Sequence, residues 1–523
     1  MRSRNLPAVA MILLSSLLQV LAFPVAGPLP PWRSALAWLA LVPLLWALLP
    51  SEPLTLRLAA LRGYGCGVLW YAGSCYWVYG TMHTYGHLSV GMSALALVLM
   101  CLYLALYHAL FGFLVGLAAR SGRGFALLLM PLLWIAVELA RARVTSFPWD
   151  LLGYTQIDNS LLTALAPFTG VYGISFLLAA VNAAIAAAVV LPGPQMSKRL
   201  ALSAAVLAAG VQNAGMWKRP QMHPGSQKAV LLQPNLDVSG SDDLNPETLT
   251  ASSARLSLQA AAVQDGPTRV VLWPESPAPY QTNQPVFTAA VTDLSTQLQA
   301  PVIADAIGIA PNLHVPRGFN LYNSAVLFAP GAGVSGRYDK VHLVPFGEFV
   351  PYADLFSFAS GLTQAVGTFD RGRARTPLPA DGHHYGVFIC YESIFGDEVR
   401  RFVDNGADVL VNLSDDGWYG DSSAPFQHIN MARMRAIENR RWLLRDTNNG
   451  ITASIDPNGT VVEAMPRNRR GAVAVHFDFL TEKTFYTRHG DLFAYTCTLL
   501  GMALLVPAGL KAGRQAVKSG DVD

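Results

Sequence analysis

Three residues that could carry nucleophilic chemistry follow apolar stretches in the second half of the chain. Glu275 follows "VVLWP", Lys340 stands in "GRYDKVHLVPFGE", and Cys390 follows "YGVFI". A thiol becomes a nucleophile when a neighbouring base removes its proton, and a carboxylate can serve as that base. A lysine ammonium beside the thiol would lower the pKa of the thiol and would stabilise the oxyanion formed when a carbonyl is attacked. The three residues are far apart in sequence, so only the fold can bring them together.

The region that carries these residues alternates between strand-like and helix-like segments. Such alternation predicts an α/β sheet with helices packed on its faces. Polar residues that follow apolar strands lie at the rim of a sheet, where active sites are usually built. We expect strands at 228–237, 268–276, 301–310, 322–330, 385–392 and 407–416, and helices between them at 247–264 and 426–440.

The composition indicates that much of the chain lies in a membrane. Hydrophobic residues make up 52% of the 523 residues, charged residues make up 14%, and the mean hydropathy is +0.33. These values lie outside the usual range of soluble proteins. Runs of about 20 apolar residues can cross a bilayer, and they predict about eight spans near 6–25, 35–50, 64–81, 90–118, 125–141, 171–191, 200–215 and 492–510. The second and seventh runs are short, and an interfacial position is the alternative for each.

The positions of the apolar runs predict three parts. Residues 1–216 would hold the first seven membrane helices, 217–489 an inserted globular domain, and 490–523 the last membrane helix and a tail. The first run follows two arginines and could be a signal peptide, but the further runs behind it favour a retained anchor. A net charge of +3 gives no reason to expect a nucleic acid partner.

Lysine and arginine in the short loops predict the orientation, because they accumulate on the cytoplasmic side. If the N-terminus lies inside, the inner segments carry Arg2, Arg4, Arg57, Arg62, Arg120, Arg123, Lys198, Arg199, Lys511, Arg514 and Lys518, and the outer loops carry Arg33, Arg141 and Arg143. This bias places both termini in the cytoplasm and the inserted domain on the outer side. In a bacterium that side is the periplasm.

Cysteine usage makes Cys390 unusual. Cys66, Cys75, Cys101 and Cys497 fall in or beside predicted spans, so Cys390 is the only cysteine of the inserted domain. An exported domain with one cysteine cannot form an internal disulfide, so this thiol needs another explanation. The alternative to a reactive thiol is a buried core cysteine at the end of a strand.

Several motifs resemble those of known families. The segments "WPES" (273–276), "YDKVHLVPFGEFVP" (338–351) and "CYESIF" (390–395) are similar to the Glu, Lys and Cys motifs of the nitrilase superfamily. The membrane runs, "FPWDLLGY" (147–154) and the stretch 412–459 resemble more specifically the apolipoprotein N-acyltransferase family. The resemblance covers nearly the whole chain. It implies a multi-pass α-helical membrane domain with an inserted α/β domain, a nitrilase-like αββα sandwich.

The resemblance also implies a function at the bacterial inner membrane. The expected reaction transfers an acyl chain from a phospholipid to the N-terminal amine of a diacylglyceryl-cysteine on a lipoprotein, by a ping-pong mechanism through a cysteine thioester. Cys390 would be the nucleophile, Glu275 the general base and Lys340 the oxyanion stabiliser. The expected partners are the phospholipid donor, the lipoprotein acceptor and the membrane. We expect no cofactor and no metal, and a monomeric chain.

Three further residues receive supporting roles from the same motifs. Glu348 in "PFGEF" would orient the lysine or assist proton transfer, and Tyr391 with Glu392 would shape the cysteine loop. One departure from the family concerns "VSGSDDLNPE" (238–247), because many relatives carry a tryptophan at this place and this chain has none.

Contacts with lipid are expected at two places. The segment after Glu348 is more apolar than a solvated loop would be, with Phe356 and Phe358 near its centre, and apolar loops usually mark a membrane or ligand contact. We predict an arm beside Cys390 that dips into the outer leaflet; packing of these side chains on the core of the domain itself is the alternative. Trp149 and Arg141 are further candidates for lipid contact.

Other polar residues are expected to be structural. Glu138 and Arg141 would form an ion pair near the end of a span. His83 and His87 would belong to a polar outer turn and bind no metal. On the helix at 426–440, Met431, Met434 and Ile437 would be core, whereas Arg433, Arg435 and Arg440 would form a solvated face.

Two other functions use the same features. A membrane-tethered amidase of the nitrilase type would employ the same three residues with water as the second substrate. A transporter would use the inserted domain only to bind a ligand, but the apolar runs contain few of the ionisable residues expected along a translocation path. Release of lysophospholipid with and without an acceptor separates the three functions.

Overall fold

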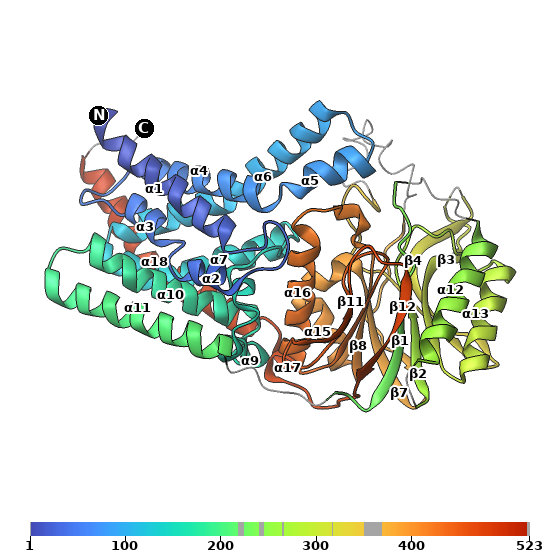
Figure 1. Ribbon diagram of the computed structural model, residues 1–523. Helices are drawn as coiled ribbons and strands as arrows, with labels where there is room; N and C mark the ends of the chain where they lie inside the picture. The colour runs from blue at the N-terminus through green and yellow to red at the C-terminus, as the bar shows by residue number, and fades with distance from the viewer. Residues whose placement is uncertain are drawn as a thin grey trace.

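The chain folds into a helical part and a part built on two β-sheets, which lie side by side in the computed structural model (Figure 1). The structure describes residues 2–217, 224–239, 245–263, 266–315, 317–349 and 369–519. The long elements of the helical part are α1 (Arg2–Leu21), α3 (Val42–Leu48), α4 (Leu56–Ser74), α6 (Val90–Ala119), α7 (Arg123–Val144), α10 (Val171–Val190), α11 (Pro194–Trp217) and α18 (Leu492–Ser519). Short helices connect them: α2 (Pro31–Ser34), η1 (Ala35–Trp38), α5 (Trp77–Gly80), η2 (Thr81–Tyr85), η3 (Leu152–Gln156), α8 (Ser160–Thr163) and α9 (Ala166–Thr169).

Four helical segments of the described chain are long and apolar enough to cross a membrane. They are Pro31–Leu48, α6, α7 and α10. The first of them corresponds to the second predicted span and is broken into α2, η1 and α3. Helices α1, α4, α11 and α18 lie where the remaining spans were predicted, and the total of eight crossings stays a prediction.

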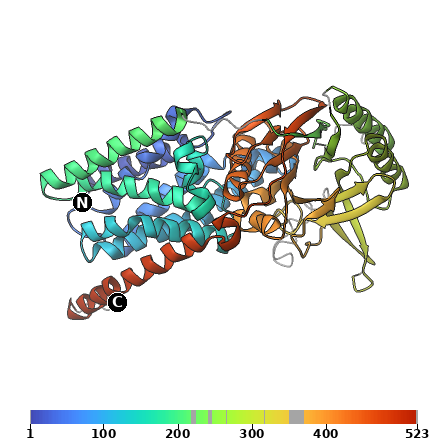
Figure 2. The same ribbon diagram turned by 90° about the horizontal axis from the view of Figure 1, so that it is seen from below.

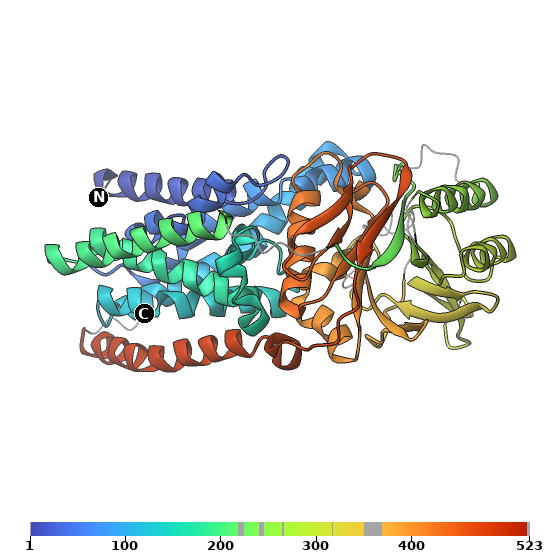
Figure 3. The same cartoon turned by 60° about the horizontal axis from the view of Figure 1, so that its bottom comes forward.

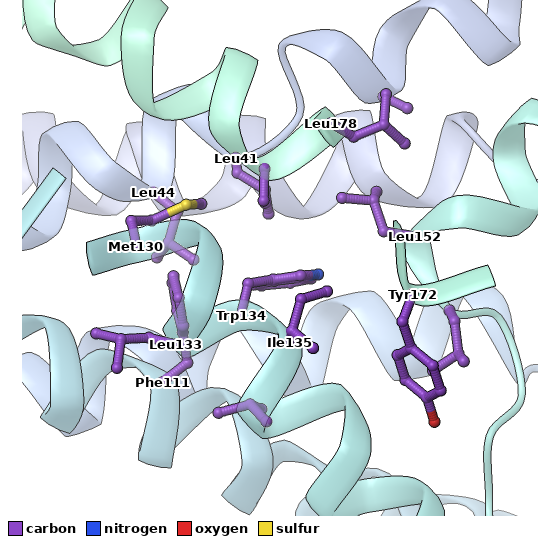
Figure 4. Close-up of a cluster of buried hydrophobic side chains, with 14 of the residues drawn as sticks. Leu41, Leu44, Phe111, Met130, Leu133, Trp134, Ile135, Leu152, Tyr172 and Leu178 are labelled. Carbon is purple, nitrogen blue, oxygen red and sulfur yellow. The ribbon is translucent and has the colours of Figure 1, made fainter. Parts of the chain in front are cut away.

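Helix α7 lies at the centre of the helical part. Its residues Met130, Leu133, Trp134 and Ile135 are buried among side chains of other helices (Figure 4), including Leu41, Leu44, Phe111, Tyr172 and Leu178. Close approach of α4 and α6 depends on glycine. A Cβ at Gly63 would lie 2.1 Å from the carbonyl oxygen of His108, and a Cβ at Gly112 would lie 2.3 Å from that of Ala59.

The second part contains two six-stranded sheets. The first has the order β12-β1-β2-β3-β4-β5 and the second the order β11-β10-β9-β8-β7-β6. In each sheet three central strands are parallel, namely β1, β2 and β3 and then β7, β8 and β9, and the other pairs are antiparallel. The strands are β1 (Gln227–Gln233), β2 (Thr268–Trp273), β3 (Val302–Pro311), β4 (Phe319–Ala329), β5 (Gly333–Asp339), β6 (Leu378–Ala380), β7 (His383–Ile389), β8 (Val409–Ser414), β9 (Leu443–Thr447), β10 (Thr452–Ile455), β11 (Val461–Met465) and β12 (Gly471–Phe477).

Helices cover the outer face of each sheet, which confirms the expected four-layer αββα arrangement. Helices α12 (Pro246–Ala261) and α13 (Pro285–Leu298) pack on the first sheet, and α15 (Gly396–Asp404) and α16 (Ala424–Asn439) pack on the second. The inner faces share one apolar core, in which Leu231, Leu272 and Ile303 belong to the first sheet and Val387 and Val411 to the second. Six of the strands were predicted from the sequence, whereas β5, β6 and β9 to β12 were not.

Helix α16 lies between the second sheet and the helical part (Figure 1) and has two buried faces. Ile429, Ala432 and Ala436 pack with the sheets, and Met431, Met434 and Ile437 pack with the helical part, as their predicted core positions require. The prediction of a solvated arginine face is wrong for Arg433 and Arg435, because the helical part covers that face. Arg433 pairs with Asp158 at 2.7 Å, and Arg435 pairs with Glu438 at 2.9 Å. Arg440 is half-buried and donates to the Asn458 side chain at 2.6 Å.

The first and last helices of the chain place both termini at the same end of the helical part. Helix α1 begins and α18 ends at the end of the helical part that is remote from the sheets (Figures 1 and 3). Seen from below, α18 runs along one side of the other helices (Figure 2), and it packs against α7. The two sheets therefore lie beyond one end of the helices, and the two termini lie at the other.

Candidate active site

The three candidate catalytic residues meet at one edge of the double sheet. Glu275 stands two residues after β2, Lys340 follows β5 directly, and Cys390 follows β7 directly. Strand β5 runs antiparallel to β4 and β4 antiparallel to β3, so β5 ends at the same edge as the parallel strands. The carboxyl ends of parallel strands are the usual place for a site in such sheets.

Lys340 joins two carboxylates in the interior. Its side chain is 1% exposed, and its Nζ lies 3.2 Å from Glu275 Oε1 and 2.9 Å from Glu348 Oε1. Asn323, on β4, donates its amide group to the same two oxygens at 2.8 and 2.9 Å. The backbone N–H of Asp415 donates to the other oxygen of Glu275 at 3.0 Å. These contacts orient both carboxylates and hold the ammonium at the sheet edge.

Electrostatics favour a charged lysine and a protonated cysteine in the resting site. Burial alone would lower the pKa of Lys340, but the carboxylates of Glu275 and Glu348 raise it well above its ordinary value. Burial raises the pKa of the Cys390 thiol, and the charge of Glu275 raises it further. Lys340 lowers the thiol pKa as predicted, but its effect is outweighed. The thiol therefore needs a base when it reacts, and Glu275 is the carboxylate that also hydrogen-bonds it.

Glu392 connects the lysine loop, which follows β5 and begins at Lys340, to the cysteine loop, which follows β7 and begins at Cys390. Its carboxylate accepts the hydroxyl of Tyr338 at 2.8 Å, the backbone N–H of Val341 at 2.8 Å and that of His342 at 3.0 Å. Its other oxygen accepts the backbone N–H of Ile389, the residue before Cys390, at 2.8 Å. The neighbouring Tyr391 points towards the helical part and donates its hydroxyl to the carbonyl oxygen of Ser146 at 3.3 Å. These hydrogen bonds connect the loop of Cys390 to its surroundings, and the supporting roles of Tyr391 and Glu392 stay a prediction.

The nucleophile candidate occupies a strained position. Cys390 has a φ of 48° in the left-handed region and begins the short 3-10 helix η5 (Cys390–Ile394). Such a conformation costs a non-glycine residue about 1–3 kcal/mol and persists where the surroundings determine it. Strain of this kind is common at functional sites.

A buried polar chain lies beneath η5. Ser393 Oγ lies 2.7 Å from His428 Nε2, and His428 Nδ1 lies 2.9 Å from Asp416 Oδ1. Arg445 donates to both oxygens of Asp416 at 2.9 Å. Burial would raise the pKa of Asp416, but Arg445 and the hydrogen bond from His428 hold it well below its ordinary value. Burial lowers the pKa of His428, and the charge of Arg445 lowers it further, so the imidazole is neutral.

A second ion-pair cluster supports the start of α15. Glu398 lies 3.3 Å from His342 Nδ1 and 2.6 Å from the guanidinium of Arg375. Burial would raise the pKa of Glu398, but the hydrogen bond from His342 and the charge of Arg375 lower it to about 2. The cluster therefore anchors His342, two residues after Lys340, to Glu398 on α15, the helix that follows η5.

Two of the candidates for lipid contact lie inside the protein. Trp149 is 0% exposed, and Arg141 is 3% exposed, donates to the carbonyl oxygen of Trp149 at 2.6 Å and lies over the ring of Trp70. The predicted ion pair of Arg141 with Glu138 is wrong, because Glu138 instead accepts from the Trp134 indole at 3.0 Å and the Leu152 backbone N–H at 2.8 Å. Phe356 and Phe358 lie outside the described residues.

Several residues of the site were not predicted from the sequence. Asn323, Asp415 and His428 all contact a candidate catalytic residue or its loop, yet none had been assigned a role. A weak signal existed for Asn323, which is a polar residue at the start of an apolar strand. His428 offers no comparable signal, because its partners Ser393, Asp416 and Arg445 come from separate elements that only the fold brings together.

The chain matches known families over most of its length. Residues 15–184 match the apolipoprotein N-acyltransferase N-terminal domain, and residues 211–483 match the carbon-nitrogen hydrolase family. An apolipoprotein N-acyltransferase of Geobacter metallireducens is 36% identical over 501 residues, which are 93% of this chain and 92% of the relative. One of Nitrosomonas europaea is 32% identical over 475 residues, which are 89% of this chain and 90% of the relative.

Solved structures of the nitrilase type are also similar. A nitrilase superfamily member from Saccharomyces cerevisiae is 15% identical with a TM-score of 0.37, over 50% of this chain and 93% of that chain. A carbon-nitrogen hydrolase from Helicobacter pylori G27 is 17% identical with a TM-score of 0.36, over 48% of this chain and 89% of that chain.

Proposed function

The chain belongs to the apolipoprotein N-acyltransferase family, and from that premise we propose that it moves an acyl chain from a phospholipid to the N-terminal amine of a diacylglyceryl-cysteine on lipoproteins. The observation that carries the proposal is the ion-paired group of Glu275, Lys340 and Glu348 beside the strained Cys390. An ammonium, a base and a thiol at one sheet edge are the parts that acyl transfer through a cysteine requires.

The first step makes a thioester. Glu275 takes the proton of the Cys390 thiol, and the sulfur attacks the ester carbonyl of the phospholipid. Lys340 donates to the oxyanion of the tetrahedral intermediate. The bond to the glycerol oxygen breaks, and Glu275 returns its proton to that oxygen, which leaves as lysophospholipid.

The second step transfers the acyl group. The amine of the lipoprotein attacks the thioester carbonyl, and Glu275 accepts a proton from the amine nitrogen. The carbon–sulfur bond breaks, and the thiolate recovers the proton from Glu275. Glu348 and Asn323 act throughout by orienting Lys340 and Glu275, and Glu392 and Tyr391 hold the cysteine loop.

Intact-protein mass spectrometry with phospholipid alone tests the thioester. We expect an added acyl mass that neutral hydroxylamine removes and that Cys390→Ser lacks. Cys497→Ser is the matched control, because Cys497 is a buried thiol on α18, and this variant should keep the adduct. Acyl transfer by a protein that never carries the adduct would refute the mechanism.

The same assay separates the alternative functions. A membrane-tethered amidase would release free fatty acid from the adduct in water, without an amine acceptor. A transporter would release no lysophospholipid. We expect one equivalent of lysophospholipid without acceptor and continued release when a diacylglyceryl-cysteine peptide is added.

We place both termini in the cytoplasm and the sheets in the periplasm. The excess of lysine and arginine in the inner segments supports this orientation, as does the common end at which α1 begins and α18 ends. A membrane-impermeant thiol reagent tests it in intact cells. A cysteine at the exposed Asp381 should react directly, and one at the exposed Arg57 should react only after permeabilisation.

A further inference from the structure

Trp149 and His428 stack on each other where the helical part meets the second sheet. Their ring centroids are 5.8 Å apart with planes at 18°, and both side chains are 0% exposed. Trp149 lies in the connection between α7 and η3, and His428 lies on α16. The indole Nε1 of Trp149 donates to Gln427 Oε1 at 2.9 Å, and its carbonyl oxygen accepts from Arg141. The indole is therefore fixed against the imidazole by groups from both parts of the chain.

His428 connects this stack to the nucleophile. Its Nε2 lies 2.7 Å from Ser393 Oγ and 3.2 Å from the carbonyl oxygen of Cys390. Asp416 Oδ1 and Arg445 hold the imidazole at Nδ1, so Nε2 faces both the Ser393 hydroxyl and the Cys390 carbonyl oxygen. Ser393 belongs to η5, the short helix that Cys390 begins.

Ser393, His428 and Asp416 are arranged like a Ser-His-Asp triad, but no substrate can reach them. Ser393, His428 and Asp416 are all 0% exposed. A fully buried imidazole cannot exchange protons with a lipid ester, whereas it can fix the helix that bears the thiol. Cys390 needs such support, because its left-handed φ persists only where its neighbours determine it.

We propose that Trp149 and His428 form a positioning pair through which the helical part holds Cys390 in its reactive place. Trp149 orients the imidazole, the imidazole anchors Ser393 and packs against the Cys390 carbonyl, and η5 fixes the direction of the thiol. The pair rests on the proposed function only in that Cys390 is the nucleophile. It acts on the rate of the chemical step and not on lipid affinity.

The test compares Trp149→Leu and Trp149→Phe in the full chain. Two rates are measured: alkylation of Cys390 by iodoacetamide, followed by peptide mapping, and acyl-enzyme formation from a long-chain phospholipid and a short water-soluble ester. Small misplacement of a reacting group costs up to about 100-fold in rate. We expect Trp149→Leu to lower alkylation and kcat at least about tenfold on both substrates, with KM within about twofold, and Trp149→Phe to keep most of the rate through its stacked ring.

A matched control is available in the helical part. Trp38 is also buried and also donates its indole Nε1 to a glutamine, Gln212, at 2.8 Å, but it lies in η1. Trp38→Leu should leave alkylation and kcat at wild-type values. If Trp149→Leu raises KM for the long-chain lipid alone and leaves alkylation unchanged, Trp149 is a lipid contact and the positioning pair is refuted.

A second set of variants tests the contact between His428 and Ser393 directly. Ser393→Ala removes the anchor of η5 and should slow alkylation of Cys390, whereas Ser295→Ala, at a buried serine on α13, should not. His428→Gln, which keeps a polar group near Nε2, should be faster than His428→Asn. Unchanged alkylation in Ser393→Ala and both His428 variants would overturn the proposal even if Trp149→Leu fails to fold. Failure of the proposed function would appear separately, as wild-type protein that releases no lysophospholipid and transfers no acyl group, whatever the alkylation rates of these variants.

Discussion

Replacement of Lys340 by methionine should impair both stability and rate, for reasons that can be separated. Lys340 is 1% exposed and makes two ion pairs, at 3.2 Å to Glu275 and 2.9 Å to Glu348. Removing one member of a buried charged group costs about 3–5 kcal/mol in stability, because its partners stay buried and uncompensated. Loss of an oxyanion donor lowers the rate by about 100- to 1,000-fold. We expect Lys340→Met to lose at least that much in acyl-enzyme formation and to unfold at a lower temperature.

A second variant separates the two effects. Lys340→Met combined with Glu348→Gln removes one negative charge together with the positive one, so part of the lost stability should return. The rate should not return, since no ammonium faces the oxyanion. Single-turnover release of lysophospholipid measures the rate, and thermal unfolding in detergent measures the stability. Lys228→Met, at a buried lysine on β1 that donates to the carbonyl oxygen of Ala261 at 2.9 Å, is the control for loss of a buried lysine.

Two results would refute this reasoning. If Lys340→Met kept more than about a tenth of the wild-type rate, the oxyanion would have another principal donor, since one such donor is worth at least about 100-fold. If the double variant recovered its rate along with its stability, Lys340 would only balance charge. Either result would mean that Lys340 of the "YDKVHLVPFGE" motif has a structural role and is not the main oxyanion donor.

Three further predictions concern the supporting structure. Gly63→Ala should lower the melting temperature of the detergent-solubilised protein, because the new methyl would lie 2.1 Å from a carbonyl oxygen of α6, whereas Gly65→Ala, with open space around its Cβ, should not. Glu398→Gln should be less stable than wild type at pH 7. Because the folded pKa of Glu398 is depressed from 4.5 to about 2, this difference should persist down to pH 4.5 and disappear between pH 4.5 and pH 2. Tyr338→Phe removes a hydroxyl that donates to the Glu392 carboxylate at 2.8 Å, and should cost about 1.5–3 kcal/mol in unfolding free energy.

The sequence predicted the catalytic candidates because their positions depend on local pattern. Glu275 and Cys390 each follow an apolar strand, and the parallel strands of such a sheet end at a common edge. Lys340 follows β5 and was identified through the "YDKVHLVPFGE" motif. Strand β5, which escaped prediction, lacks an apolar pattern. Strand β5, "GVSGRYD", is an edge strand with mostly exposed or half-buried residues, and its composition resembles a turn.

Partners of the catalytic residues could not be predicted, because they depend on packing between distant elements. The amide of Asn323 bridges two carboxylates that lie 48 and 25 positions away. Helix α16 illustrates the same limit at the level of an element. Helical periodicity predicts one apolar face and one solvated face, but a second layer covers α16, so its arginines are paired inside the protein.

The double burial of α16 has a consequence for how the protein assembles. Synthesis begins with α1 to α11, continues through the sheets, and ends with α18. Until the sheets have folded, the helical part presents an uncovered apolar surface where Met431, Met434 and Ile437 will later pack. Docking of α16 onto that surface must therefore follow folding of the sheet region, and α18 closes against α7 only at the end. A shortened chain that carries the sheets alone would expose the same apolar face of α16 to water, so we expect it to aggregate.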